Sequence, residues 1–298
     1  MIKDEKTASI ALMVTAIIWG TGFIGTEYAI QAGAEASLII SMRFGIAGML
    51  LGMINYRLIR HMDFATFKVG VIAGIILFFG FYLQTVGQSL STVSNSSFLT
   101  STCVVIVPFV VWAISKKPPR PKYFILGTTS LCGAGILTLN FSEGLHFQIG
   151  DIFVLIAAAC FAIHISYLGI FGKGKNPIVM TFLQMMVAGI FAFLFMMVFD
   201  RKALDFEIVK KALPSTTYLA LTSSCLCYYL QTIAQQYASP AKTGLILCTE
   251  GLFGCIFAII LGMDPLTWRI VLGGAVIMCS VVLAEMDMAI FHRKKTEE

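Results

Sequence analysis

Long apolar runs separated by short polar breaks most restrict how this chain can fold. Hydrophobic residues make up 58% of the 298 residues and charged ones only 12%. A backbone that crosses a hydrocarbon core must satisfy its own hydrogen bonds, so only helices and closed barrels can span it. The runs have the roughly 20 residues that a spanning helix needs, and they lack the short alternation of barrel strands. The sequence therefore predicts an all-α polytopic membrane protein.

Ten transmembrane helices are predicted, in two sets of five. The first set is Thr7–Ile30, Ser37–Tyr56, Phe67–Gln88, Val93–Ile114 and Tyr123–Leu139. The second set is Asp151–Phe171, Ile178–Phe199, Leu213–Tyr237, Ala241–Leu261 and Trp268–Met286. Most breaks are shorter than a dozen residues, so successive helices are expected to be antiparallel neighbours.

Basic residues are distributed unequally between the two predicted sides. If the N-terminus is cytoplasmic, that side receives 15 of the 21 Lys and Arg residues, and the opposite side receives five. Cytoplasmic loops carry such an excess of positive charge. We therefore expect a multi-pass protein of the cell membrane with both termini in the cytoplasm, including a tail at 287–298.

One short motif occurs twice. The stretch FYLQTVGQ begins at Phe81 and YYLQTIAQ begins at Tyr228, 147 positions later, with five identical residues. The similarity extends into the neighbouring helices, which indicates two copies of a five-helix unit, residues 7–139 and 151–286. Because five is odd, the second copy must be inverted. Inverted repeats are typical of secondary transporters, and a duplicated structural membrane protein is the alternative.

Several stretches resemble a known family over nearly the whole chain. They are IIWGTGFIGTEYAI (Ile17–Ile30), SMRF in the second predicted span, LTSTCVVIVP ending at Pro108, and the region from Gln235 to Glu285. All resemble the EamA-type transporters of the drug/metabolite transporter superfamily. The resemblance implies ten helices, a central cavity near the membrane midplane, and passage of small metabolites or drugs, most often outward.

Three ionisable residues inside the predicted spans are candidates for function, because charge is costly there and such side chains usually face a cavity. Glu250 could take a proton or hold an ammonium group, or it could be a structural carboxyl bonded to Ser or Thr. Arg43 could bind a substrate carboxylate, or it could pair with Glu27. His164 could relay protons, or it could be a neutral core histidine that donates to a carbonyl.

The duplicated motif adds polar candidates at matching positions of the third and eighth helices. These are Tyr82 and Gln84 in the first copy and Tyr229 and Gln231 in the second. Glutamine both donates and accepts, which suits a polar substrate or a bond between helices. Trp19 could contribute to an aromatic wall that holds an organic cation. Ordinary packing is the alternative for each of these residues.

The sequence favours a secondary transporter that moves a small organic metabolite, an amino acid or related compound, outward by alternating access. A proton-coupled exporter of cationic drugs or amines that uses Glu250 is the alternative. No phosphate-binding loop, metal-ligand spacing or catalytic set of residues is present in the sequence. We therefore expect no enzymatic activity, no cofactor, no metal and no nucleic acid partner. The expected partners are the substrate and the lipid bilayer, and the protein is expected to be a monomer or homodimer.

Overall fold

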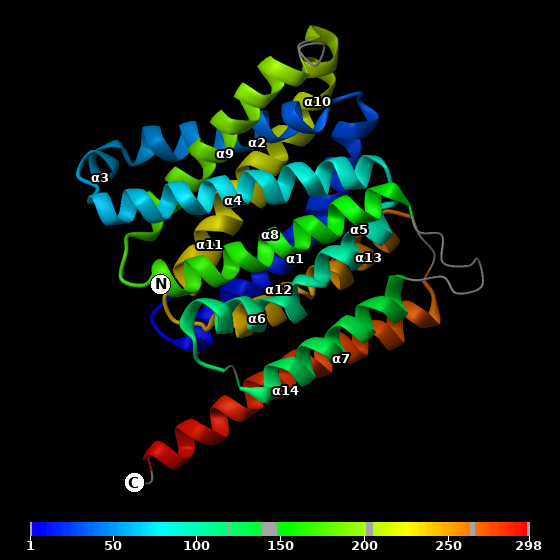
Figure 1. The fold of residues 1–298 in the computed structure, drawn as a ribbon. Coiled ribbons are helices and arrows are strands. Elements are labelled where there is room, and N and C mark those ends of the chain that lie inside the picture. The colour runs from blue at the N-terminus through cyan, green and yellow to red at the C-terminus, as the bar shows by residue number, and fades with distance from the viewer. Residues whose placement is uncertain (1, 119, 139–147, 201–204, 263–265, 297–298) are drawn as a thin grey trace.

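The computed structural model describes residues 2–118, 120–138, 148–200, 205–262 and 266–296, and every regular element in these ranges is helical (Figure 1). The first half contains α1 (Glu5–Gln31), α2 (Ala36–Ile54), α3 (Tyr56–Arg60), α4 (Phe64–Ser89), α5 (Val93–Ser101), α6 (Cys103–Ser115) and α7 (Pro121–Thr138). The second half contains α8 (Ile149–Phe171), α9 (Pro177–Phe199), α10 (Phe206–Tyr218), α11 (Cys227–Ala234), α12 (Pro240–Leu247), α13 (Glu250–Ile260) and α14 (Trp268–Thr296). The predicted all-α class is confirmed.

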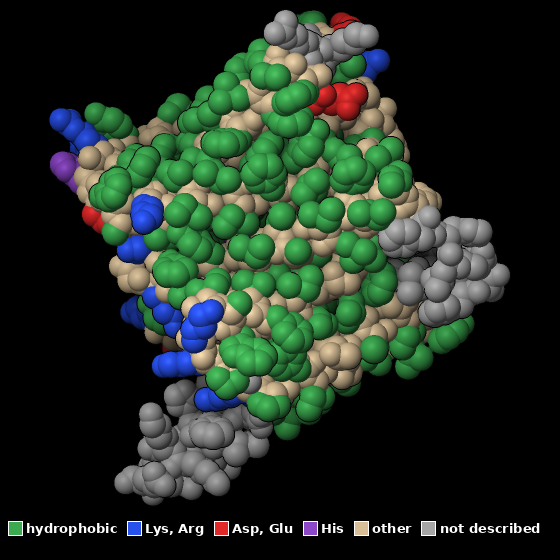
Figure 2. Space-filling model, viewed as in Figure 1, with side chains coloured by type: hydrophobic (Ala, Val, Ile, Leu, Met, Phe, Trp, Pro, Cys, Tyr) green, Lys and Arg blue, Asp and Glu red, His purple; other side chains and the backbone are tan. Residues whose placement is uncertain are grey.

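Apolar helices give the molecule the surface of a membrane protein. Among the described residues, six helical stretches are long and apolar enough to cross a membrane: α1, α2, α4, Asn95–Ser115, α8 and α9. Large apolar side chains cover the broad face in Figure 2, and Met49, Phe79 and Phe193 are 49–55% exposed. So much exposed apolar surface is stable only against lipid.

Successive helices run back and forth between two ends of the molecule (Figure 1). The start of α1 and the end of α14 lie at the same end, where Lys and Arg side chains gather in Figure 2. Helices α7 and α14 pack together at one margin of the bundle. Helix α1 lies near the centre and contacts α11, α12 and α13 of the second half. The core therefore joins the two halves.

Close backbone approach between α1 and α13 depends on glycine. A Cβ atom built on Gly20 would lie 2.7 Å from the backbone nitrogen of Gly254 and 2.8 Å from the Cβ of Phe253. Membrane helices pack closely through such small residues, because lipid offers no hydrophobic drive for association. Only glycine at position 20 fits this crossing without a shift of either helix.

The start of α4 is fixed by a cap at the edge of the apolar region. The Asp63 carboxylate accepts hydrogen bonds from the Thr66 backbone nitrogen at 2.7 Å and from the Thr66 hydroxyl at 2.6 Å. A carboxylate in this position satisfies amide groups that have no partner within the helix. The bond from the Thr66 side chain, followed by the backbone bond, lowers the pKa of Asp63 below its ordinary value of 3.8.

Two predicted spans are interrupted in the middle. Thr102 separates α5 from α6, and Cys248 and Thr249 separate α12 from α13. The Thr102 hydroxyl donates to the Leu99 carbonyl at 2.6 Å, and the Thr249 hydroxyl donates to the Ile246 carbonyl at 2.7 Å. The backbone nitrogens of the same threonines bond to the same two carbonyls, each at 3.1 Å.

Both threonines thus draw a carbonyl away from the regular helical pattern, as such hydroxyls can. The sequence predicts continuous helices over Val93–Ile114 and Ala241–Leu261, because neither break falls on a Gly or a Pro. The start of the predicted span Leu213–Tyr237 differs as well. Helix α10 already begins at Phe206, continues into a π-helical segment, Leu219–Leu226, and then into α11.

Candidate functional site

A cavity lies in the core between the two interrupted helices. It is lined by Trp19, Gly22, Phe23, Thr26, Arg43, Phe81, Gln84, Gln88, Thr100, Ser101, Cys103, Phe161, His164, Ile165, Ser223, Tyr228, Gln231, Leu247, Cys248 and Glu250. The centres of water molecules can occupy about 60 Å³ of it, which is room for several waters. Both halves of the chain contribute to its wall.

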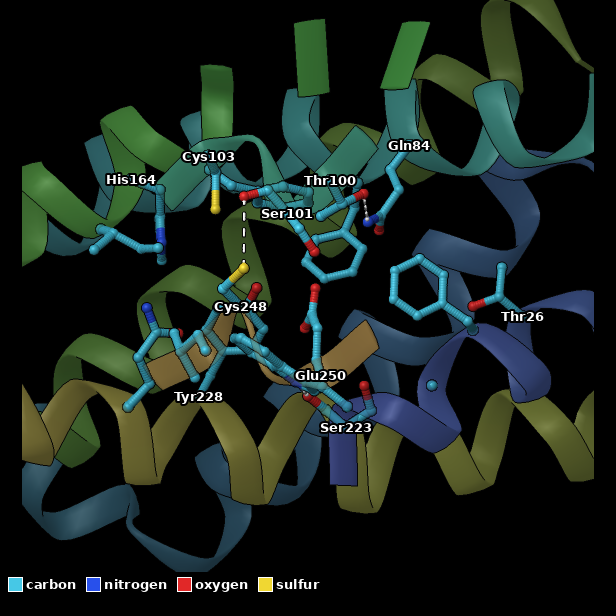
Figure 3. Close-up of a pocket in the computed structure, with 18 of the residues that line it drawn as sticks. Thr26, Gln84, Thr100, Ser101, Cys103, His164, Ser223, Tyr228, Cys248 and Glu250 are labelled. Atoms are coloured by element: carbon cyan, nitrogen blue, oxygen red, sulfur yellow. Dashed lines mark hydrogen bonds between the residues drawn. The ribbon is translucent and has the colours of Figure 1, made fainter. Parts of the chain in front are cut away.

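The two breaks meet at this cavity. Ser101 and Cys103 flank the first break, Cys248 lies in the second, and Glu250 directly follows the second. The Cys248 thiol donates to the Ser101 carbonyl across the interface at 3.8 Å. Figure 3 shows these side chains facing one another from opposite walls. The interruptions therefore bring polar side chains of both halves together at the cavity.

Glu250 is the first residue of α13 and is 9% exposed. Its carboxylate projects into the cavity toward the wall that carries Thr100 and Ser101 (Figure 3). Within the described part of the chain, the Glu250 carboxylate has no hydrogen bond and no ion pair. The hydrogen-bonded structural carboxyl considered from the sequence is therefore not found there. A buried carboxylate without a partner is unfavourable unless a cation or a proton neutralises it.

Arg43 of α2 enters the same cavity and is 2% exposed. Its Nε donates to the Ser224 hydroxyl and its Nη2 to the Ser223 hydroxyl, each at 3.0 Å. The guanidinium carbon also lies 4.5 Å from the ring centroid of Phe81 and 5.0 Å from that of Phe44. These neutral partners hold the guanidinium without cancelling its charge, so the cavity wall can attract an anion.

Glu27, the acid suggested as a partner for Arg43, has other neighbours. Its carboxylate accepts from the Gln31 side chain at 3.1 Å and from the Gln88 side chain at 3.2 Å. Glu27 is not among the residues that line the cavity. Arg43 and Glu250 are therefore the oppositely charged pair on this cavity wall.

The π-helical segment positions part of the wall that faces Arg43. Its wider turn carries Ser223, whose hydroxyl accepts from Arg43 and whose carbonyl accepts from the Trp19 indole nitrogen at 2.8 Å. Single π-helical turns often occur at functional sites. Trp19, a predicted site residue, also contacts Tyr228, with ring centroids 5.2 Å apart. The indole is thus fixed in orientation at the cavity wall.

His164 of α8 is 1% exposed and lines the cavity. Its Nε2 lies 2.8 Å from the Gln184 side-chain oxygen. The Gln184 side-chain nitrogen bonds in turn to the Met180 carbonyl at 3.1 Å. Because the Gln184 nitrogen is the donor to Met180, the Gln184 oxygen is the acceptor that faces His164. Nε2 of His164 therefore carries the proton. The ring is held by an amide of α9, whereas the sequence suggested a backbone carbonyl as its partner.

The duplicated motif contributes matching residues of α4 and α11 to the cavity. Gln84 and Gln231 both line it, and so do Phe81 and Tyr228, which lie one turn earlier at equivalent positions. Gln84 donates to the Thr100 hydroxyl at 2.9 Å. The helical period places residues three and four apart on one face, and this spacing could have pointed to Phe81 and Tyr228.

Tyr82 and Tyr229, the tyrosines chosen from the motif, are absent from the described cavity wall. Each follows the residue that does line the cavity, so it turns about 100° away. The Tyr82 ring instead packs against Phe195, with centroids 4.7 Å apart. Ser223 is not predictable as a site residue, because no pattern in the sequence indicates a π-helical turn. Within the described ranges, no group of three His, Cys, Asp or Glu side chains could hold a metal ion.

Comparison with known proteins gives this cavity its context. A profile of the EamA-like transporter family matches residues 6–139 and 148–286. The chain belongs to this family. The resemblance stated from the sequence is therefore confirmed, and this EamA-like transporter is a membrane protein of the drug/metabolite transporter superfamily.

One relative and one solved structure cover most of the chain. An uncharacterized transporter of Archaeoglobus fulgidus is 27% identical over 279 residues, which span 94% of this chain and 86% of the relative. A crystal structure of a protein covers 94% of this chain and 97% of its own, with a TM-score of 0.77 and 12% identity. The solved structure supports the fold alone.

Proposed function

We propose that this EamA-like transporter is a secondary transporter that carries a small organic metabolite, an amino acid or a related compound, outward by alternating access. One observation carries the proposal: the central cavity holds the buried carboxylate of Glu250 and the buried guanidinium of Arg43, and neither has an oppositely charged partner among the described residues. A zwitterion would supply an ammonium group to the first and a carboxylate to the second. Both charges would then be paired in a medium of low dielectric constant.

The proposed architecture has ten membrane-spanning segments in two inverted five-helix repeats, residues 7–139 and 151–286. Each interrupted stretch, α5–α6, α10–α11 and α12–α13, would count as one span, together with α7 and α14. The matching threonine breaks at Thr102 and Thr249 support this reading, because they occur at equivalent places in the two halves. Inverted repeats allow the halves to exchange conformations, which is how alternating access arises.

The proposed location is the cell membrane, with both chain ends in the cytoplasm. The gathering of Lys and Arg at the end where α1 begins supports it, since cytoplasmic loops carry such an excess. We assign the protein no enzymatic activity, in keeping with a family of transporters. It would act as a monomer or homodimer within lipid.

Thermal stabilisation of the purified protein tests the proposal first. The panel would contain amino acids, amines, nucleosides and antibiotics, and it would be repeated with Glu250→Gln. A ligand that binds only the folded state raises the apparent melting temperature by mass action. We expect amino acids to stabilise the wild type and to lose most of this effect in Glu250→Gln. Equal stabilisation of the variant would remove Glu250 from the binding site.

A proton-coupled exporter of cationic amines is the second candidate. The aromatic residues Trp19, Phe23 and Tyr228, which share the cavity with the unpaired Glu250, favour it because such rings attract organic cations. Transport that requires an imposed proton gradient and that accepts amines without a carboxylate would support this candidate over the first. Loss of transport in Arg43→Met would count against it, because a simple amine has no use for the guanidinium.

A further inference from the structure

A short relay of side-chain amides leads from α8 to the cavity. The Gln235 side-chain nitrogen donates to the Ile165 carbonyl at 2.8 Å. The Gln231 side-chain nitrogen donates to the Gln235 side-chain oxygen at 3.4 Å. Both glutamines are 1% exposed. The relay therefore lies in the protein interior, and Gln231, its last member, lines the cavity.

The first bond determines the orientation of the whole relay. A backbone carbonyl can only accept, so Gln235 must turn its NH₂ toward Ile165 and its oxygen toward Gln231. Gln231 must then turn its own NH₂ toward Gln235. Its Oε1 is left over, and this atom is buried with no hydrogen-bond partner in the described structure. These hydrogen bonds thus leave the side-chain oxygen of Gln231, a residue of the cavity wall, available as an acceptor.

A glycine gives Gln235 its access to the Ile165 carbonyl. A Cβ atom on Gly169 would lie 3.2 Å from the Gln235 side-chain nitrogen and 2.5 Å from Pro240. Gln84, the equivalent residue of the first half, donates to the Thr100 hydroxyl. A hydroxyl can donate as well as accept, so this bond does not fix the orientation of the Gln84 amide as the Ile165 carbonyl fixes that of Gln235.

The geometry points to Gln231 as a specificity residue that accepts a hydrogen bond from the substrate, so that the cavity takes cations bearing N–H groups. Glu250 and Gln231 line the same cavity. The Gln231 Oε1 is a buried acceptor without a partner in the described structure. A primary ammonium, secondary ammonium or guanidinium group can neutralise the charge of Glu250 and also donate a hydrogen bond to Gln231. A quaternary ammonium satisfies the charge alone and leaves Gln231 unmatched. This inference rests on the proposed transport function and narrows its substrate class.

Matched pairs of compounds separate the charge from the hydrogen bond. The probes would be L-leucine against L-leucine betaine and n-butylamine against butyltrimethylammonium, with dissociation constants measured by titration into the purified protein. In the wild type, we expect at least one primary amine to bind about tenfold or more tightly than its trimethylated partner. In Gln231→Met, which keeps the length of the side chain and removes the acceptor, we expect the ratio within that pair to fall toward one.

Two further variants distinguish specificity from structure. Gln235→Met leaves the cavity wall intact but frees the Gln231 amide to turn, so the selectivity ratio is expected to fall. The loss of two buried hydrogen bonds should also lower the melting temperature. If Gln235→Met lowered the melting temperature but kept the wild-type ratio, the inference would be contradicted. Tyr229→Phe, which changes a residue away from the cavity, should keep the wild-type ratio.

Equal binding of both members of each pair, or an unchanged ratio in Gln231→Met, would overturn the inference. Failure of every amine to bind would overturn it too. A non-amine ligand found in the broader stabilisation panel would still support transport, so the two proposals can fail separately.

Discussion

Replacing Gly20 by alanine should separate α1 from α13 and weaken the fold beside the cavity. The added Cβ would lie 2.7–2.9 Å from backbone and Cβ atoms of Phe253 and Gly254, whereas ordinary contact begins at 3.4 Å. The helices must therefore move apart by about half an ångström or more, because atoms this close to the backbone have no alternative rotamer. Overpacking of this kind typically costs about 1–3 kcal/mol.

The displacement also has a functional consequence. Helix α13 begins at Glu250, and the residues next to Gly20 on α1 include Trp19 and Gly22 of the cavity wall. A shift of α13 relative to α1 changes the spacing between the carboxylate and the aromatic wall. We therefore expect Gly20→Ala to lower both stability and ligand affinity.

The assay is thermal unfolding of the purified variant, compared with Gly45→Ala as a matched control. Gly45 also lies inside a membrane helix, but a Cβ atom there meets nothing within 4 Å. Gly20→Ala should lower the apparent melting temperature by several degrees, and Gly45→Ala should leave it unchanged or raise it slightly. If the two variants had the same stability, the close crossing of α1 and α13 would be refuted.

Three further predictions concern other parts of the molecule. Lys242 is 1% exposed, and its Nζ lies 3.0 Å from the Glu5 carboxylate. Glu5→Gln should therefore destabilise the fold by about 1–3 kcal/mol in thermal unfolding. Glu35→Gln, which changes an exposed residue, should keep the wild-type stability and serves as the control. Because its hydrogen bonds lower the pKa of Asp63, this cap contributes stability above the unfolded pKa and loses it as pH falls through the folded pKa; Asp63→Asn should therefore flatten the fall of the melting temperature with pH below about 4, and an unchanged slope would contradict the cap. Gln184→Leu removes the amide that bonds to His164, so it should weaken ligand binding more than Thr181→Val on the same helix, as titration of both variants would test.

Periodicity and hydropathy could predict the helical class and the approximate ends of most helices. For α8 and α9, the predicted ends lie within two residues of Ile149–Phe171 and Pro177–Phe199, because charged or Pro-containing breaks mark them. The interruptions at Thr102 and Thr249 could not be predicted. A threonine hydroxyl can bond to the preceding turn inside a regular helix as well, and only packing decides whether the helix breaks there.

The candidate site was predictable where charge was decisive. Glu250, Arg43 and His164 stood out because ionisable groups are costly inside a membrane, and the structure gathers all three at one cavity. The hydrogen-bond partners of Arg43 and His164 were harder to predict from the sequence. Ser223 and Gln184 are ordinary polar residues, and their role depends on which helices meet. Choosing Tyr229 over Tyr228 reflects one step along a helix, which the motif alone does not settle.

Exchange across the membrane of reconstituted vesicles tests the central claim most directly. Proteoliposomes loaded with unlabelled L-amino acids would be placed in a mixture of labelled L-amino acids, with the wild type, Glu250→Gln and Glu35→Gln measured in parallel. Glu35 is an exposed carboxylate that makes no side-chain cap bond. We expect the wild type and Glu35→Gln to accumulate label and Glu250→Gln to lose exchange. Exchange by Glu250→Gln at the wild-type rate would contradict a transport site centred on this carboxylate.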